Sequence, residues 1–121
     1  MENARPNAFV AVCPTRDILA RLAEKWTMLT LAALKADTLR FGALHRRIEG
    51  VSQKMLTKTL RKLEQDGLVT RQVFDEMPLR VEYTLTPLGQ ELSDLVLALK
   101  TWTEVNMMQI TSANAATEQR R

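Results

Sequence analysis

The sequence of 121 residues predicts a mainly α-helical fold that carries one small β-hairpin, an α+β class. Apolar residues recur every three or four positions along most of the chain, which is typical of helices that bury one face. Residues 68–74 and 80–85 instead alternate apolar and polar side chains, as half-buried strands do. These two strands follow a helix rich in Lys and Arg, residues 52–65. The order of helix, strand, turn and strand predicts a winged helix-turn-helix fold.

The first three helices are bounded by recognisable signals. Pro14 suits the first helical position, where its missing N–H costs nothing, so one helix is predicted over Pro14–Ala23. A second should span Trp26–Lys35, and a third, shorter one should be opened by Arg40 and cover Phe41–Ile48. Gly50 then suits the left-handed conformation that ends a helix.

Ser52 is a helix cap, and the helix after it is amphipathic. At about 100° per residue, Leu56, Leu60 and Leu63 fall within one narrow stripe that should face the core. The opposite side carries Lys54, Thr57, Lys58, Arg61 and Gln65. Together with the preceding short helix and turn, this segment has the proportions of a helix-turn-helix.

Positive charge is concentrated on this helix-turn-helix segment. The net charge of the whole chain is only +3, yet residues 40–71 hold eight Lys/Arg against three Asp/Glu. Residues 72–121 hold four Lys/Arg against seven Asp/Glu. A basic patch on one segment is the electrostatic footprint of DNA binding, and a solvated charged face is the alternative.

The helix-turn-helix geometry assigns roles to these side chains. The N-terminal part of the second helix meets base edges, while the first helix crosses the DNA backbone. The candidate base-reading residues are Ser52, Gln53, Lys54, Thr57 and Lys58. The candidate phosphate contacts are Arg40, Arg46, Arg47 and Arg61. For any one of them, a solvated side chain is the alternative.

The turn between the strands contains Pro78, which cannot disturb the strand pairing there. Arg80 follows it and is a further candidate for a phosphate contact in the flanking minor groove. The alternative is an ion pair with Asp75 or Glu76, two acids that also make the turn less basic.

The last helix should begin at Thr86-Pro87 and run to about Ile110. Its apolar stripe consists of Leu88, Leu92, Leu95, Val96, Leu99, Trp102 and Val105. A chain of this length has little left to cover so long a stripe, so we expect a homodimer in which two such helices pair. Folding back over its own domain is the alternative. The expected organisation is therefore an N-terminal arm (residues 1–12), a DNA-binding and dimerisation domain (13–110) and a polar, frayed tail (111–121).

Several function classes find no support in the sequence. No apolar run approaches the roughly 18 residues of a membrane span, and the N-terminal residues do not resemble a signal peptide. One cysteine makes no intramolecular disulfide, which favours a reducing cytoplasm. With one histidine, His45, and scattered glycines, there is no metal-ligand cluster and no phosphate-binding loop. We expect no enzymatic activity, no metal and no cofactor.

Six blocks in order carry a resemblance to a known family. They are Cys13-Pro14, residues 24–27 (EKWT), 40–44 (RFGAL), 52–57 (SQKMLT), 63–71 (LEQDGLVTR) and 80–89 (RVEYTLTPLG). This pattern resembles the HxlR-type branch of the MarR-like winged-helix regulators over residues 13–102. The resemblance implies a homodimeric transcription factor whose N-terminal segment and last helix form the dimer interface and whose two recognition helices read a palindrome in double-stranded DNA. Family members often have a Gly pair where this chain has Ala23-Glu24, so we expect a stiffer junction.

Cys13 is the candidate for redox sensing. In part of the family that it resembles, a cysteine at this place senses quinones, aldehydes or oxidants. A thiol at the start of a helix has its thiolate stabilised by the helix dipole, and Arg16 nearby should help. The alternative is a small apolar side chain with no redox role.

Two other possibilities stay open. A small-molecule effector would bind in an apolar pocket lined by Trp26, Met28, Trp102, Met107 and Met108, although such residues more often form core. The alternative function is a winged-helix protein-interaction module without specific DNA binding. Such a module has no need for Lys54, Lys58 and Arg61 on one exposed face.

Overall fold

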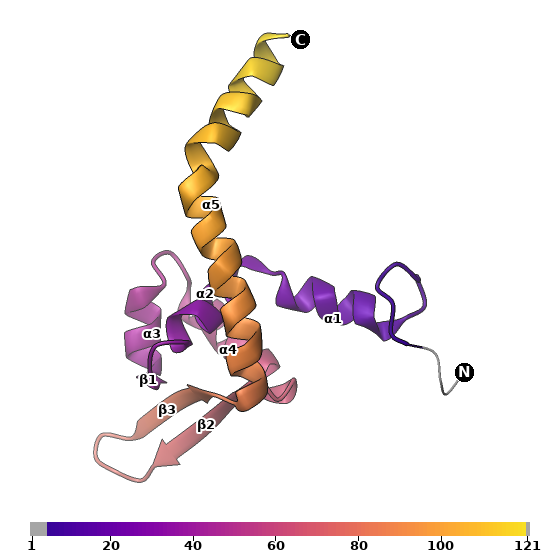
Figure 1. The fold of residues 1–121 in the computed structure, drawn as a ribbon. Coiled ribbons are helices and arrows are strands. Elements are labelled where there is room, and N and C mark those ends of the chain that lie inside the picture. Colours follow the sequence, from indigo (N-terminus) through magenta and orange to yellow (C-terminus); the bar gives the residue numbers. More distant parts are fainter. Residues whose placement is uncertain (1–4, 121) are drawn as a thin grey trace.

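The computed structural model describes residues 5–120, which form five helices and a three-stranded antiparallel sheet (Figure 1). The elements are α1 (Pro14–Leu22), α2 (Lys25–Leu34), β1 (Leu39–Arg40), α3 (Phe41–Arg47), α4 (Gln53–Gln65), β2 (Val69–Phe74), β3 (Arg80–Leu85) and α5 (Pro87–Gln119). The predicted winged helix-turn-helix of mainly α class is confirmed. The predicted helices begin and end within two residues of the observed ones, except at the end of α5.

Local capping explains where the helices start. The Ser52 side chain accepts a hydrogen bond from the Met55 N–H at 3.0 Å, as predicted. Thr86 caps α5 in the same way through the Gly89 N–H at 3.0 Å, with Pro87 in the first turn. At the junction where the family often has a Gly pair, Glu24 caps α2 by accepting from the Thr27 N–H at 3.0 Å. These side chains satisfy amide groups that have no partner inside the helix.

The sheet has the strand order β1-β3-β2, and β2 and β3 form the predicted hairpin. Strand β1 pairs Leu39 with Tyr83 and was not predicted, because two residues are too few to show an alternation. The expected alternation in β2 is only partly correct. Val69 is buried, but Val73 is 46% exposed because the hairpin tip extends beyond the helices that cover the sheet at its base.

Helix α2 lies at the centre of the core and packs against α4 and α5. The buried core leucines are Leu31, Leu34, Leu44, Leu56, Leu60, Leu63, Leu68 and Leu85. Buried Ser93 of α5 donates a hydrogen bond to the Leu31 carbonyl at 2.9 Å. Lys35 adds an ion pair to Asp94 at 2.7 Å. The first half of α5 is therefore attached firmly to α2.

Gly89 allows α5 to begin close to the end of α4. A Cβ atom at this position would overlap the backbone carbonyl of Leu68. Position 89, three residues after the cap, is thus a glycine for reasons of space. Thr86 accepts the Gly89 N–H and donates to the Gly67 carbonyl at 2.7 Å.

The prediction that the last helix ends near Ile110 is wrong, because α5 continues to Gln119. The chain contains no glycine or proline after Gly89 to stop it. Polar side chains of the last turns bond within the helix: Thr111 donates to the Met107 carbonyl and Thr117 to the Ala113 carbonyl. The expected frayed tail is helical from 111 to 119. Of the predicted arm and tail, residues 1–4 and Arg121 lie outside the described residues.

Two segments project from the body of the molecule. Figure 1 shows α1 extending to one side and the second half of α5 rising well above the other helices. Helix α1 has no buried residue. Within residues 5–120, no helix is both long and apolar enough to cross a bilayer.

Candidate nucleic-acid interface

The outward face of α4 gathers most of the predicted base-reading side chains. Because Leu56, Thr59, Leu60 and Leu63 bury the other face, the cations have to point away from the core. They border a hollow of about 610 Å³, the surface of which is formed by Phe41, Gln53, Lys54, Thr57, Lys58, Arg61, Lys62 and Gln65. Five of the ten predicted DNA contacts lie on this one surface, namely Gln53, Lys54, Thr57, Lys58 and Arg61.

Ser52 has a structural role first. Its oxygen accepts the Met55 N–H with one lone pair, which leaves the hydroxyl proton and a second lone pair for a base or phosphate. Capping comes before any DNA contact, because the cap stabilises the start of α4, and α4 carries the DNA-contacting side chains.

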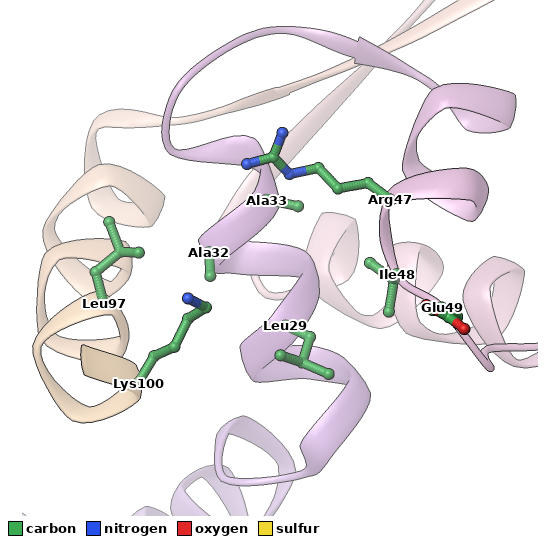
Figure 2. A pocket seen from close by; sticks show the side chains of 8 residues that line it. All are labelled: Leu29, Ala32, Ala33, Arg47, Ile48, Glu49, Leu97 and Lys100. Atoms are coloured by element: carbon green, nitrogen blue, oxygen red, sulfur yellow. The ribbon is translucent and has the colours of Figure 1, made fainter. Parts of the chain in front are cut away.

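The three predicted arginine contacts around α3 point in different directions. Arg40 is exposed at the cap position of α3. Arg46 folds back over its own helix, because its Nη1 lies 3.3 Å from where a Cβ of Gly42 would be. Arg47 lines a separate hollow between α2 and α5 (Figure 2). The structure therefore does not bring Arg47 into the α4 surface.

Arg80 on the hairpin is held by its own strand. Its guanidinium forms ion pairs with Glu76 at 2.7 Å and with Glu82 at 2.9 Å. It also lies 3.7 Å over the ring of Phe74. Of the two partners considered from sequence, Glu76 is the one observed. A phosphate would have to compete with both acids for this arginine.

Sequence reasoning did not select Lys62 and Arg71. Lys62 follows Lys58 by about one helical turn, so the sequence could have indicated that the two lie on the same side of α4. Both line the hollow on the α4 surface and a second hollow between α4 and α1. Arg71 pairs with Tyr83 across the sheet and shares a hollow of about 370 Å³ with Arg61 and Glu64. Its place opposite α4 depends on how the sheet packs, which the sequence alone does not show.

Cys13 occupies the cap position of α1 and is not part of the α4 surface. Its pKa is lowered from the ordinary value of a thiol, first by the Thr15 hydroxyl and then by backbone N–H groups of Asn7 and Thr15. The Sγ atom lies 3.2 Å from Thr15 Oγ1 and 3.3 Å from the Asn7 nitrogen. Hydrogen bonds of this kind favour the thiolate.

Arg16 supports Cys13 differently from what was expected. Its guanidinium donates to the carbonyls of Ala8 at 3.1 Å and Phe9 at 2.9 Å and does not bond to the sulfur. These two hydrogen bonds hold the turn that contains Ala8 and Phe9, and so they fix the position of Asn7, whose N–H donates to the sulfur.

The expected effector pocket is not formed by the residues that were named for it. Met28 lines a hollow of about 300 Å³ with Leu29, Val96 and Leu99. Trp102, Met107 and Met108 are exposed on the projecting part of α5. Among residues 5–120, no three His, Cys, Asp or Glu side chains gather as metal ligands do.

Comparison with known proteins gives a consistent result. The HxlR-like helix-turn-helix family matches residues 21–111. The HTH-type transcriptional regulator YtfH of Escherichia coli is 44% identical over 104 residues, 86% of this chain and 82% of that protein. The solved structure of the transcriptional regulator ytfH from Salmonella typhimurium superposes with a TM-score of 0.87 at 42% identity, covering 92% of this chain and 99% of the other.

A redox regulator is also among the structural neighbours. HypR in its reduced form superposes with a TM-score of 0.74 at 35% identity, covering 82% of this chain and 98% of that one. Together with the α4 surface, these matches show that the chain belongs to the HxlR-like helix-turn-helix family and is a DNA-binding transcriptional regulator.

Proposed function

We propose that this regulator works as a homodimer that inserts two α4 helices into successive major grooves of a palindromic operator. The observation that carries the proposal is the outward face of α4, where Lys54, Lys58 and Arg61 are exposed along one capped, well-packed helix. Rigid placement suits base reading, because contacts to base edges depend on orientation. Arg40 and Arg46 supply contacts to the DNA backbone, which set position and affinity. Arg47 lies on the separate hollow between α2 and α5, and Arg80 would have to leave Glu76 and Glu82 to make such a contact.

The dimer is proposed from apolar surface that the chain leaves uncovered. On α5 the residues beyond the core contact are exposed, with Trp102 at 56% and Val105 at 76%. On the arm before α1, Phe9 is 93% and Val12 is 90% exposed. Apolar patches of this extent are typical of association sites. Two-fold pairing through both segments would cover them and set the two α4 helices roughly 34 Å apart, one turn of DNA.

For regulation we propose that Cys13 responds to thiol-reactive oxidants. Its pKa is lowered by hydrogen bonds from Thr15 and Asn7, and it lies beside the arm that the dimer would use. HypR, which this chain resembles, is a redox regulator. Oxidation of Cys13, by a disulfide to the second subunit or to a small thiol, would change how the subunits meet and so change the spacing of the α4 helices. The protein would work in the cytoplasm, where its DNA is, and the proposal assigns it no catalytic step.

The test is fluorescence anisotropy with DNA from immediately upstream of the protein's own gene. Lys58→Ala and Arg61→Ala should each weaken binding and lower the slope of log affinity against log salt by about 1. Arg120→Ala, at the far end of α5, is the matched control and should leave both unchanged. If neither α4 variant altered affinity or salt slope, the DNA-reading role of α4 would be wrong, and the protein-interaction module would replace it.

The redox part is tested in the same assay. Diamide should alter the affinity of the wild-type protein and leave Cys13→Ser unaffected. Equal responses of the two proteins would remove Cys13 as the sensor and direct the search to a small-molecule effector.

A further inference from the structure

A hollow between α4 and the hairpin contains a cation that the proposed function does not use. The volume of this α4–hairpin hollow is about 370 Å³, and it lies where α4 packs against β2. The residues that line it are Thr57, Leu60, Arg61, Glu64, Arg71 and Tyr83. Thr57 and Arg61 also border the hollow on the outward face of α4, so the two hollows adjoin along the candidate DNA surface.

Arg71 interrupts an otherwise apolar face of the hairpin. Residues 69, 71 and 73 of β2 lie opposite residues 85, 83 and 81 of β3, so these six side chains share one side of the sheet. The five besides Arg71 are Val69, Val73, Val81, Tyr83 and Leu85. Arg71 and Tyr83 line the hollow together with residues of α4, so this side of the sheet faces α4. An apolar surrounding does not stabilise a guanidinium, so its position there indicates a partner outside the core.

Neither arginine of the α4–hairpin hollow has an anionic partner. The ion pairs within residues 5–120 include neither Arg61 nor Arg71, and both residues are exposed. Glu64 lines the same hollow and forms no ion pair with either of them. The hollow therefore presents two unpaired positive charges and one negative charge.

Tyr83 adds a hydrogen-bond donor on the inner wall of the hollow. The residue is only 8% exposed, and its hydroxyl takes part in no hydrogen bond within the described part of the chain. No buried side-chain oxygen in that part is left without a partner, so this hydroxyl has to reach the open space of the hollow. Polar groups of buried residues are normally hydrogen-bonded. The Tyr83 hydroxyl is therefore free to donate to an anion that enters the hollow.

We propose that the α4–hairpin hollow binds one phosphate of the operator backbone, an inference that rests on the proposed function. Arg61 from α4 and Arg71 from β2 would donate to the two free oxygens of the phosphodiester, and Tyr83 from β3 would donate to one of them. With α4 in the major groove and the hairpin on the flanking backbone, the DNA strand between them passes the place where α4 meets the hairpin. The same phosphate would thus join both elements and fix the angle at which α4 enters the groove.

The first experiment measures operator affinity by anisotropy over a range of salt concentrations. Arg71→Gln should weaken binding and lower the slope of log affinity against log salt by about 1. Tyr83→Phe removes only the hydroxyl and should weaken binding by about 3- to 10-fold. Its salt slope should stay unchanged, because a neutral donor releases no counterion. Its thermal stability should also equal that of the wild type, since the hydroxyl has no partner in the free protein.

Two further variants separate a phosphate contact from a structural role. Arg120→Gln makes the same change as Arg71→Gln at the far end of α5 and should leave affinity and slope unchanged. Glu64→Gln should strengthen operator binding, because it removes a negative charge from the hollow that would hold the phosphate. Circular dichroism checks that all variants fold. The phosphate site is ruled out if Arg71→Gln keeps the wild-type affinity and slope, if Tyr83→Phe binds as the wild type does, or if Glu64→Gln weakens binding.

The second experiment asks whether the three side chains hold the same phosphate. Methylphosphonate groups, which carry no charge, are placed one at a time along the operator. At one position the substitution should weaken binding by the wild type and have little further effect on Arg61→Gln, Arg71→Gln or Tyr83→Phe. A different position for each variant would overturn the shared site.

A free phosphate ion has the same chemistry as the DNA backbone, and competition distinguishes the two. At constant ionic strength, inorganic phosphate should displace the operator no better than chloride does, because the ion is not positioned by a duplex. Displacement by inorganic phosphate that Arg71→Gln abolishes would assign the hollow to the free ion and overturn its assignment to DNA. If the wild type bound no operator, the proposed function and this inference would both fail. Operator binding by the wild type with equal binding by Arg71→Gln would overturn this inference alone.

Discussion

Helices α4 and α1 are both amphipathic, but only α4 buries its apolar face within the chain. Of the thirteen residues of α4, four are buried, and its apolar stripe lies against the body of the same chain. Of the nine residues of α1, none is buried, and Ile18 and Leu19 are exposed. An amphipathic pattern therefore shows that a helix has a face to cover, but it does not show which molecule covers it.

Helix α5 contains both situations in one element. Up to Val96 it buries Gly89, Ser93 and Val96, with Gly89 beside Leu68 and Ser93 bonded to Leu31 of α2. From Leu99 onward its apolar side chains are exposed. Lys25 and Met28 of α2 still border a hollow with Leu99, so a contact between chains would begin beyond this point.

The largest expected effect is the difference in unfolding free energy lost between a substitution in α4 and one in α1. Leu56→Ala removes a fully buried side chain and should lower the free energy of unfolding by about 2–5 kcal/mol. Ile18→Ala on α1 should cost less than about 0.5 kcal/mol in the monomer, because its side chain is already 43% exposed. Urea unfolding at low protein concentration measures both. Similar losses for the two variants would mean that α1 is part of the monomer's core.

The next effect tests what covers the outer part of α5. Trp102→Ala should weaken self-association by about 10- to 100-fold, as expected from leaving one large apolar side chain out of an interface. Glu104→Ala is the control, because Glu104 lies about 200° around the helix from Trp102. Sedimentation equilibrium gives both dissociation constants. A dimer that tolerates Trp102→Ala would not use this stripe.

A smaller effect concerns the reactivity of Cys13 ahead of α1. Thr15→Val removes the hydrogen bond that contributes most to lowering the Cys13 pKa, so the pKa should rise. At neutral pH a smaller fraction of the thiol is then ionised, and alkylation by iodoacetamide should be slower, with its pH midpoint moved upward. Asp17→Asn in the same helix is the control. An unchanged pH profile in Thr15→Val would show that Thr15 does not activate the sulfur.

The smallest effect concerns the ion pair that holds α1 to the rest of the chain. Arg21 of α1 pairs with Asp66 at the end of α4, with 3.0 Å between Nη2 and Oδ1. Because both side chains are partly exposed, Arg21→Ala should cost only about 0.2–1 kcal/mol. Hydrogen exchange should show faster exchange in α1 and no change in α4. Unchanged exchange in α1 would mean that the α1–α2 junction alone holds it.

Much of the fold was predictable because local rules and the tertiary structure agree. Ser52 and Thr86 cap helices as their sequence context indicated, and Leu56, Leu60 and Leu63 form the stripe given by helical periodicity. Strand β1 and the length of α5 were not predictable in this way. Two residues show no period, and nothing in a polar segment tells a helix where to end when no glycine or proline stops it.

The candidate site likewise contains residues that the sequence located and residues that it did not. The α4 side chains were found from sequence because they share one helix, so their common face is a matter of angle. Arg47 was not placed correctly by reasoning of that kind, and Arg71 was not selected. For Arg80, the ion pair with Glu76 was one of the two alternatives that the sequence left open. Arg47 borders the α2–α5 hollow and Arg71 lies on the sheet face opposite α4, and both of these settings depend on long-range packing. Glu76 and Glu82 are local partners, because they lie four and two residues from Arg80.

The sequence by itself determined the winged helix-turn-helix class, the capped recognition helix with its cationic face, and the cysteine at the start of α1. These follow from interactions among residues close along the chain. Only the tertiary structure decided which apolar faces are covered, that Arg47 borders the hollow between α2 and α5, and that Arg71 lies beside Arg61. The physical reason is that burial and ion pairing depend on distances in space, and the packing of α2 against α4 and α5 sets those distances.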